Sequence, residues 1–157
     1  MRSIVRIDNP EDRFLEFRAL IQRREGLEQV LDCFPFLIST NVSCSKLATA
    51  EPIFDLMIMD EAGQCSNPLS LLPMDRCRRA LFVGDPSQLQ PVITLPASRN
   101  TRLVWDYDIP QAYDYKMNSI LSTMLKIDTI SKFILLKHHY RCADLIIAFS
   151  NQKYYGG

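Results

Sequence analysis

Two polar clusters in the middle of the sequence hold the residue types best suited to chemistry. Asp60 and Glu61 follow the apolar run 56–59, and the sequence Gly-Asp-Pro-Ser-Gln at 84–88 follows the apolar run 80–83. One carboxylate of such an acid pair can hold Mg²⁺, usually through its water shell, while its neighbour accepts a proton from an attacking water. Adjacent acids are also favourable in the first turn of a helix, so the pair by itself leaves both interpretations open.

The second cluster combines a permissive glycine, a stiff proline and an amide. Gly84 allows backbone conformations that other residues resist, Pro86 stiffens the turn, and Gln88 can orient a water or a phosphate oxygen. A Gly-Asp-Pro turn alone is common, but two polar clusters that each follow an apolar run are a rarer combination. Ligands of open parallel sheets bind outside the carboxyl ends of the strands. We therefore expect Asp60, Glu61 and Gln88 to converge on one crevice at that edge.

The strands that would position these clusters are short apolar runs. Such runs occur at 36–38, 56–59, 80–83 and 133–136, and each is continuous rather than alternating. Continuous runs are typical of strands that are covered on both faces, as in a parallel sheet flanked by helices. The predicted fold class is therefore α/β.

Helices are predicted between and around these runs. One amphipathic packing helix is expected over 10–32, a short helix near 68–72, and two more over 117–126 and from 143 to about 154. The remaining stretch, 91–115, is predicted to be an irregular surface connection.

The aromatic residues of this connection allow two interpretations. Trp105, Tyr107, Tyr113 and Tyr115 could stack on nucleic-acid bases, but their acidic neighbours would repel phosphate. We therefore expect these rings to pack on the domain.

Composition excludes several classes of protein. The 157 residues have the length of one domain, and 18 basic against 18 acidic side chains leave no basic excess of the kind that marks autonomous nucleic-acid-binding domains. No apolar run is long enough to cross a membrane, and the N-terminus has no signal-peptide pattern, which favours a cytoplasmic protein, or a nuclear one in a eukaryote. The five cysteines form no CxxC pair, so buried thiols are expected rather than a metal site.

The motifs resemble those of a known family. Residues 54–64 resemble motif II, the Walker B segment, of AAA-like superfamily 1 helicases of the RNA-surveillance and replication-helicase type, whose pattern is Asp-Glu-Ala-x-Gln. Residues 81–91 are similar to their motif III, Gly-Asp-x-x-Gln-Leu-x-Pro, and residues 136–156 to motif IV of the bacterial branch. Residues 34–40 match the strand and Ser/Thr turn upstream of motif II.

This resemblance implies a RecA-like P-loop NTPase lobe that uses ATP and Mg²⁺ and acts on DNA or RNA, without a membrane. It assigns roles at the nucleotide site to eight residues: Asp60 holds the metal, Glu61 is the general base, Gln88 contacts the γ-phosphate, Arg141 is a cationic finger, Gln64 is a sensor, Tyr140 shapes the cleft, and Gly84 and Asp85 in the motif III turn bind the nucleotide. His138 and His139 are expected to be ordinary packing or surface residues.

The phosphate-binding loop of that family, Gly-x-x-x-x-Gly-Lys-Ser/Thr, has no counterpart here, because none of the five glycines precedes a lysine and a hydroxyl residue. The resemblance therefore divides the chain into the latter part of a first RecA-like lobe, 1–129, and the opening strand and helix of a second, 130–157. We expect a fragment of an ATP-dependent helicase that is inactive without the remainder of the helicase chain. The alternative is a stand-alone, non-catalytic interaction module.

Overall fold

The computed structural model describes residues 4–48, 51–136, 138 and 142–156. Six helices, two strands and several short turns of helix follow one another: η1 (Ile4–Arg6), α1 (Pro10–Ile21), α2 (Arg24–Cys33), η2 (Ser43–Lys46), β1 (Met57–Met59), η3 (Ala62–Gln64), α3 (Asn67–Met74), β2 (Ala80–Phe82), α4 (Ala97–Asp106), η4 (Gln111–Tyr113), α5 (Ile120–Ile127), α6 (Asp144–Ser150) and the π-helical turn η5 (Asn151–Tyr155).

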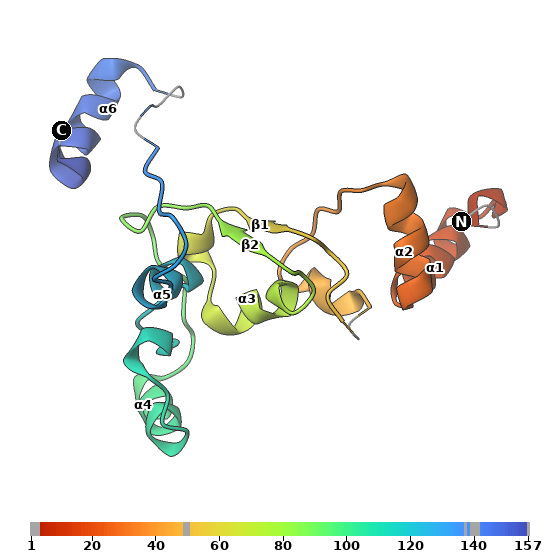
Figure 1. The fold of residues 1–157 in the computed structure, drawn as a ribbon, viewed down its shortest axis with the longest axis horizontal. Helices are drawn as coiled ribbons and strands as arrows, with labels where there is room; N and C mark the ends of the chain where they lie inside the picture. The colour runs from red at the N-terminus through yellow and green to blue at the C-terminus, as the bar shows by residue number, and fades with distance from the viewer. Residues whose placement is uncertain (1–3, 49–50, 137, 139–141, 157) are drawn as a thin grey trace.

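The sheet consists of β1 and β2, which lie side by side and parallel (Figure 1). Met57 pairs with Ala80 and Met59 with Phe82, while α3 forms part of the connection between the strands. This βαβ unit confirms the α/β class and the two central strands of the prediction. The helices at 67–74, 120–127 and 144–150 also lie close to their predicted positions.

The other two apolar runs are not strands, so that part of the prediction is wrong. Residues 36–38 and 133–136 run without regular secondary structure and are exposed, and the Ile38 side chain is fully accessible. A strand exists only where a neighbour accepts and donates its backbone hydrogen bonds. The described residues offer these two runs no such neighbour.

The strand pair is covered on one face instead of the predicted two. Met59 is buried with Ala62, Ile120 and Leu121 in a small core, against which Phe82 and Met124 pack. Ile58, which points to the opposite face, is 63% exposed. Successive side chains of a strand alternate between faces, so the continuous apolar run gives this sheet an uncovered apolar side.

The helix predicted over 10–32 is in fact two helices, α1 and α2. Arg23 has an extended backbone at the break, with φ −101° and ψ 140°. A Cβ atom at Gly26 would lie 2.2 Å from the carbonyl oxygen of Leu20, so only glycine permits this corner. The spacing of apolar residues in the sequence does not reveal this break, because α2 has an apolar side of its own, on which Leu27 and Val30 are buried.

The stretch 91–115 is not wholly irregular, because it contains α4 and η4. The amide of Asn100, which is buried on α4, donates to the carboxylate of Asp114 over 2.9 Å and ties the helix to the segment that follows. Trp105 and Tyr107 are mostly exposed, at 86% and 73%, so the expectation that they pack on the domain is also wrong. The acidic and aromatic residues of this stretch led to the prediction of a loop, whereas its alanine, arginine and leucine residues favour a helix.

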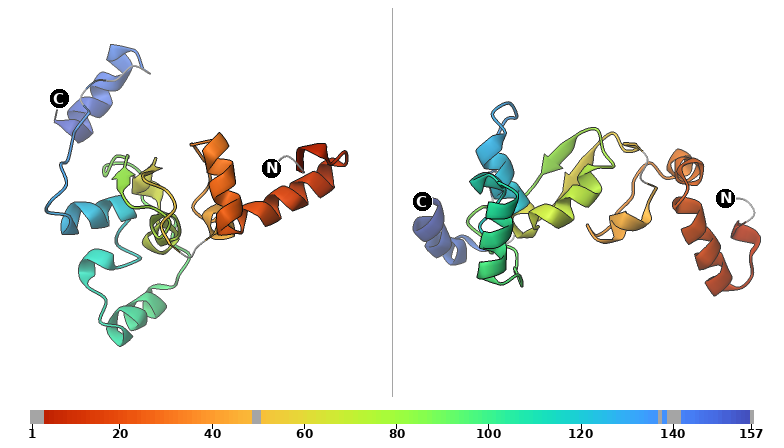
Figure 2. Two further views of the ribbon diagram at one scale, coloured as in Figure 1. Left: turned by 45° about the vertical axis from the view of Figure 1, so that its right-hand side comes forward. Right: turned by 90° about the horizontal axis from the view of Figure 1, so that it is seen from below.

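The whole arrangement is extended. α1 and α2 lie at one end, the strand pair in the middle and α6 at the other end, while α4 projects to one side (Figures 1 and 2). In the described part of the chain no helix is long and apolar enough to span a membrane.

Candidate functional site

The parallel strands bring both polar clusters to one edge. Beyond β1 and β2 the backbone pairing continues, because the Val83 amide donates to the Met59 carbonyl over 2.9 Å and the Ala62 amide to the Val83 carbonyl over 2.8 Å. The turn that starts at Asp60 and the turn that starts at Gly84 therefore begin side by side at the carboxyl edge. The convergence of the Asp60, Glu61 and Gln88 side chains on a crevice stays a prediction.

The two turns touch through their backbones, and two glycines make this possible. A Cβ atom on Gly84 would lie 3.0 Å from the Gly63 nitrogen and 3.1 Å from the Ala62 nitrogen, and one on Gly63 would lie 2.9 Å from the Asp85 carbonyl oxygen. Gly84 does not have a positive φ. Its role here is close approach rather than the unusual backbone conformation expected from the sequence.

Glu61 has the unusual backbone instead. Its φ of 51° and ψ of 38° lie in the left-handed region, which costs a residue with a Cβ atom about 1–2 kcal/mol. Three contacts hold it there: the Glu61 amide donates to Asp60 Oδ1 (2.9 Å), the Gln64 amide to the Glu61 carbonyl (2.8 Å), and Gln64 Nε2 to Glu61 Oε2 (3.2 Å). Such strain is a feature that clusters at functional sites.

The acid pair does not cap a helix in the way that the simpler interpretation requires. The next element, η3, is a single turn of three residues, and the Glu61 side chain makes no capping hydrogen bond to it. Asp60 Oδ1 accepts a hydrogen bond from the Glu61 amide, and the side chains of Asp60 and Glu61 are exposed. This geometry favours a functional use of the pair over the helix-cap interpretation.

Asp85 organises the second turn. Its Oδ1 accepts from the Ser87 amide over 2.8 Å, and its Oδ2 accepts from Gln88 Nε2 over 3.2 Å and from the hydroxyl of Tyr155. Partial burial acts to raise the pKa of Asp85, but the hydrogen bonds from Tyr155, Ser87 and Gln88 outweigh it and hold that pKa below its usual value. Sequence reasoning missed Tyr155, since no local pattern joins it to a residue so distant in the chain.

Cys65 lies close to the first turn. Burial raises the pKa of its thiol, as does the negative charge of Glu61, while a hydrogen bond with Asn41 acts in the opposite direction. None of the five cysteines is in a disulfide. The expectation of buried thiols is wrong, because Cys33 and Cys142 are exposed and the other three are only partly buried.

Four residues of the predicted motif IV, Lys137, His139, Tyr140 and Arg141, lie outside the described residues, so the roles of Tyr140 and Arg141 stay predictions. His138 is exposed. In the described ranges no three His, Cys, Asp or Glu side chains are grouped so that they could hold a metal ion by themselves.

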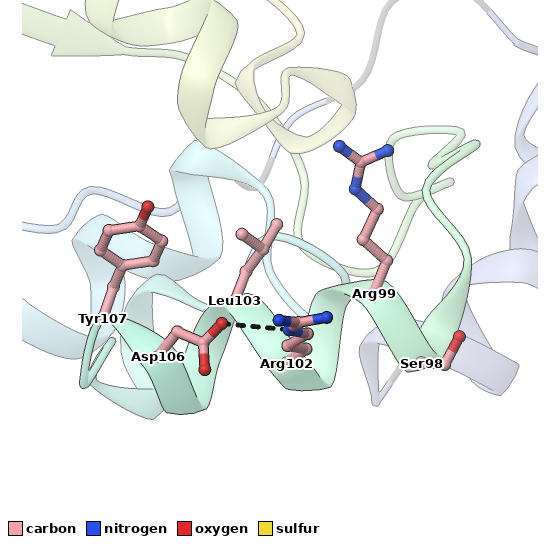
Figure 3. A pocket seen from close by; sticks show the side chains of 6 residues that line it. All are labelled: Ser98, Arg99, Arg102, Leu103, Asp106 and Tyr107. Carbon is pink, nitrogen blue, oxygen red and sulfur yellow. Dashed lines mark hydrogen bonds and ion pairs between the residues drawn. The ribbon is translucent and has the colours of Figure 1, made fainter.

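An open pocket on α4 is a separate feature. It has a volume of about 590 Å³. Figure 3 shows Arg99 and Leu103 of α4 and Tyr107, which directly follows this helix, extending beside it, with Arg102 paired to Asp106 at 3.3 Å. None of the predicted site residues that the structure describes lines it. The pocket therefore has no part in the site at the strand edge.

A family of AAA domains matches residues 8–95, which is more than half of the chain and includes both turns. The chain belongs to the AAA domain family. No solved structure matches this AAA domain significantly.

Known proteins similar to this AAA domain are helicases. The 5'-3' DNA helicase ZGRF1 of Mus musculus is 27% identical over 151 residues, which cover 94% of the chain. Helicase SEN1 of Saccharomyces cerevisiae is 29% identical over 140 residues (87% of the chain), and the DNA replication ATP-dependent helicase/nuclease DNA2 of Gallus gallus is 27% identical over 131 residues (83%). These matches confirm the resemblance to superfamily 1 helicases. The chain spans only 7%, 6% and 12% of the lengths of these three relatives.

The family implies ATP, and the acid pair fits the metal that accompanies it. Mg²⁺ prefers oxygen ligands and is usually held by one or two carboxylates together with phosphates. Asp60 directly follows β1 and has an exposed carboxylate whose Oδ2 accepts no hydrogen bond from the described residues. Asp60 is therefore suited to hold the ion.

Proposed function

We propose that this AAA domain is part of the ATP-hydrolysing site of a superfamily 1 DNA or RNA helicase. The observation that carries the proposal is the backbone contact between the turns at Gly63 and Gly84, which sets an acid pair and an amide at the same edge of a parallel sheet. In this proposal residues 1–129 are the latter part of a RecA-like first lobe, and residues 130–157 begin the second.

In the proposed site Asp60 holds Mg²⁺ and Glu61 is the general base. Bound Mg·ATP supplies the phosphoryl group and much of the compensating charge. Gln64 fixes Glu61 Oε2, which leaves Oε1, free of hydrogen bonds from the described residues, to take a proton from water. The left-handed backbone of Glu61 holds this carboxylate in place before the reaction.

The remaining roles concern the phosphates and follow from the resemblance. Gln88 contacts the γ-phosphate, and Gly84 and Asp85 form the turn that presents it. Arg141 neutralises the charge that develops during transfer, and Tyr140 shapes the cleft. Nucleic acid is the proposed partner because the similar proteins are helicases. Because the net charge of the chain is zero, it has little excess positive charge to attract phosphates. We therefore expect the nucleic-acid strand to be bound largely by other parts of such a protein.

A chimera tests the proposal. The matching stretch of DNA2 of Gallus gallus is replaced by this chain, and nucleic-acid-stimulated phosphate release is measured with Mg²⁺ and ATP. We expect turnover in the chimera, and the Glu61→Gln substitution is expected to lower it by at least about 100-fold, because the base is lost. Glu51→Gln is the matched control, since Glu51 is exposed and pairs only with Arg24 in the described structure. Equal turnover in the Glu61→Gln and unsubstituted chimeras would overturn the role of Glu61.

A non-catalytic interaction module is the second candidate, because the sequence contains no phosphate-binding loop. The 157-residue chain by itself is accordingly expected to release no phosphate from ATP, with or without single-stranded DNA or RNA. A folded chimera that binds nucleic acid but has no turnover would favour this second candidate. Turnover by the chain alone that disappears in Glu61→Gln would show that it contains a phosphate-binding element of its own.

A further inference from the structure

The C-terminal segment reaches the turn that follows β2 through one side chain. Tyr155, the last residue of η5, donates its hydroxyl hydrogen bond to Asp85 Oδ2, although 70 positions separate the two residues. Figure 1 shows α6 apart from α3 and the strand pair, on the side of the molecule where the chain leaves β2. The contact therefore links two parts of the structure that are otherwise set apart.

The acceptor of this bond also holds a candidate site residue. Asp85 Oδ2 accepts from Gln88 Nε2 at 3.2 Å, while Oδ1 is occupied by the Ser87 amide. Both carboxylate oxygens are thus used inside the protein. Asp85 is therefore arranged to orient the amide of Gln88 rather than to contact a nucleotide itself.

We infer that Asp85 is a positioning residue for Gln88, and that Tyr155 couples the placement of the segment 142–156 to this turn through the same carboxylate. The functional meaning of the coupling rests on the proposed role of Gln88 at the γ-phosphate, but the coupling itself does not. Three donors fix the orientation of this carboxylate. Without the Tyr155 hydroxyl, Oδ2 keeps only Gln88 Nε2 as a donor among the described residues, and the carboxylate is held less firmly. Movement of the C-terminal segment that breaks the Tyr155 bond therefore also loosens Gln88.

The charge relations of the two side chains agree with this geometry. The hydrogen bond to Asp85, the small degree of burial and the negative charge of Asp85 all raise the pKa of Tyr155. The tyrosine therefore keeps its proton, and with it the ability to donate, throughout the neutral range.

The test uses the 157-residue chain without nucleotide. In ¹⁵N-labelled protein, Tyr155→Phe removes only the hydroxyl. Tyr154→Phe is the matched control, because Tyr154 lies against Lys153 and makes no hydrogen bond to the turn within the described structure. We expect Tyr155→Phe to shift the side-chain amide signals of Gln88 towards their solvent-exposed values and to speed exchange of the Ser87 amide about threefold. Tyr154→Phe should leave both unchanged.

A pH titration of the wild-type chain tests the same coupling between Tyr155 and Gln88. Lowering the pH protonates Asp85 in the wild-type chain, and the signals of Gln88 Nε2 and the Tyr155 ring should then move together with one midpoint. Equal spectra of the two Phe variants, or separate midpoints for Gln88 and Tyr155, would overturn the coupling. Neither readout requires ATP turnover, so an inactive chimera would count against the proposed function and leave this result standing.

Discussion

Glu61 shows how a single residue can serve the site at the expense of stability. A left-handed backbone is unfavourable for glutamate, and the hydrogen bonds from Gln64 and to Asp60 hold it in place. A glycine would adopt the same backbone without cost. The natural residue is therefore the one that suits the proposed chemistry and not the one that suits the fold.

The cost of the left-handed backbone at position 61 can be measured with two substitutions. Glu61→Gly and Glu61→Ala remove the same carboxylate, but only glycine relieves the backbone strain. We expect Glu61→Gly to have a free energy of unfolding about 1 kcal/mol greater than Glu61→Ala, measured by urea denaturation. At an ordinary helical position the order would be reversed. A more stable alanine variant would contradict the left-handed conformation.

Asp85 predicts a pH dependence. Its pKa in the folded chain lies below the usual value of 3.8, so the charged form binds its donors more tightly than the protonated form does. The stability that it contributes is therefore present above about pH 4 and is lost as the pH falls through the lowered pKa. We expect Asp85→Asn to lower the free energy of unfolding at pH 7 and to have little effect near pH 2. The exposed Asp55, replaced by Asn, is the control, and an effect of Asp85→Asn that grows with acid would contradict the sign.

At the scale of elements, the corner between α1 and α2 depends on one glycine. Leu20, in the last turn of the first helix, lies against Gly26, and α2 turns Leu27 and Val30 inward while α1 buries no residue. The second helix therefore supplies the packing at this end of the chain.

Gly26→Ala is expected to open this corner although alanine is the better helix former. The added Cβ would meet a backbone oxygen at 2.2 Å, and backbone cannot move aside as a flexible side chain can. We expect a loss of about 1–3 kcal/mol and faster hydrogen exchange in α2. Gln29→Ala, at an exposed position of the same helix, should be neutral or slightly stabilising. Slower exchange in Gly26→Ala would show that the helices do not meet as described.

At the scale of the molecule, the chain leaves much apolar surface uncovered. Its accessible surface is 12505 Å², whereas a compact monomer of 18.1 kDa has about 8,100 Å². A groove of about 500 Å³ between α1, α2 and residues 34–47 is lined mainly by apolar side chains. The exposed runs at 36–38 and 133–136 add to this surface.

An extended shape and dye binding should follow in solution. We expect a radius of gyration from small-angle scattering well above the value of about 15 Å for a compact chain of this length. A hydrophobic dye should also bind, and Ile38→Ser should reduce its fluorescence without lowering the free energy of unfolding, because Ile38 makes no buried contact. A compact scattering profile without dye binding would contradict this arrangement.

The sequence by itself determined the local features of the site. Asp60, Glu61 and Gln88 could be placed directly after strands because apolar runs and the polar residues behind them are contiguous in the chain, and β1 and β2 form where they were predicted. The family could be recognised for the same reason, since its motifs are short and local.

Only the tertiary structure decided what depends on distant partners. Runs 36–38 and 133–136 are as apolar as β1, yet they are not strands, because pairing requires a neighbour that an apolar pattern cannot supply. The close approach of Gly63 and Gly84 and the bond from Tyr155 to Asp85 likewise join residues from different parts of the sequence. Such contacts follow from how the chain crosses itself in space, which no local pattern of residues encodes.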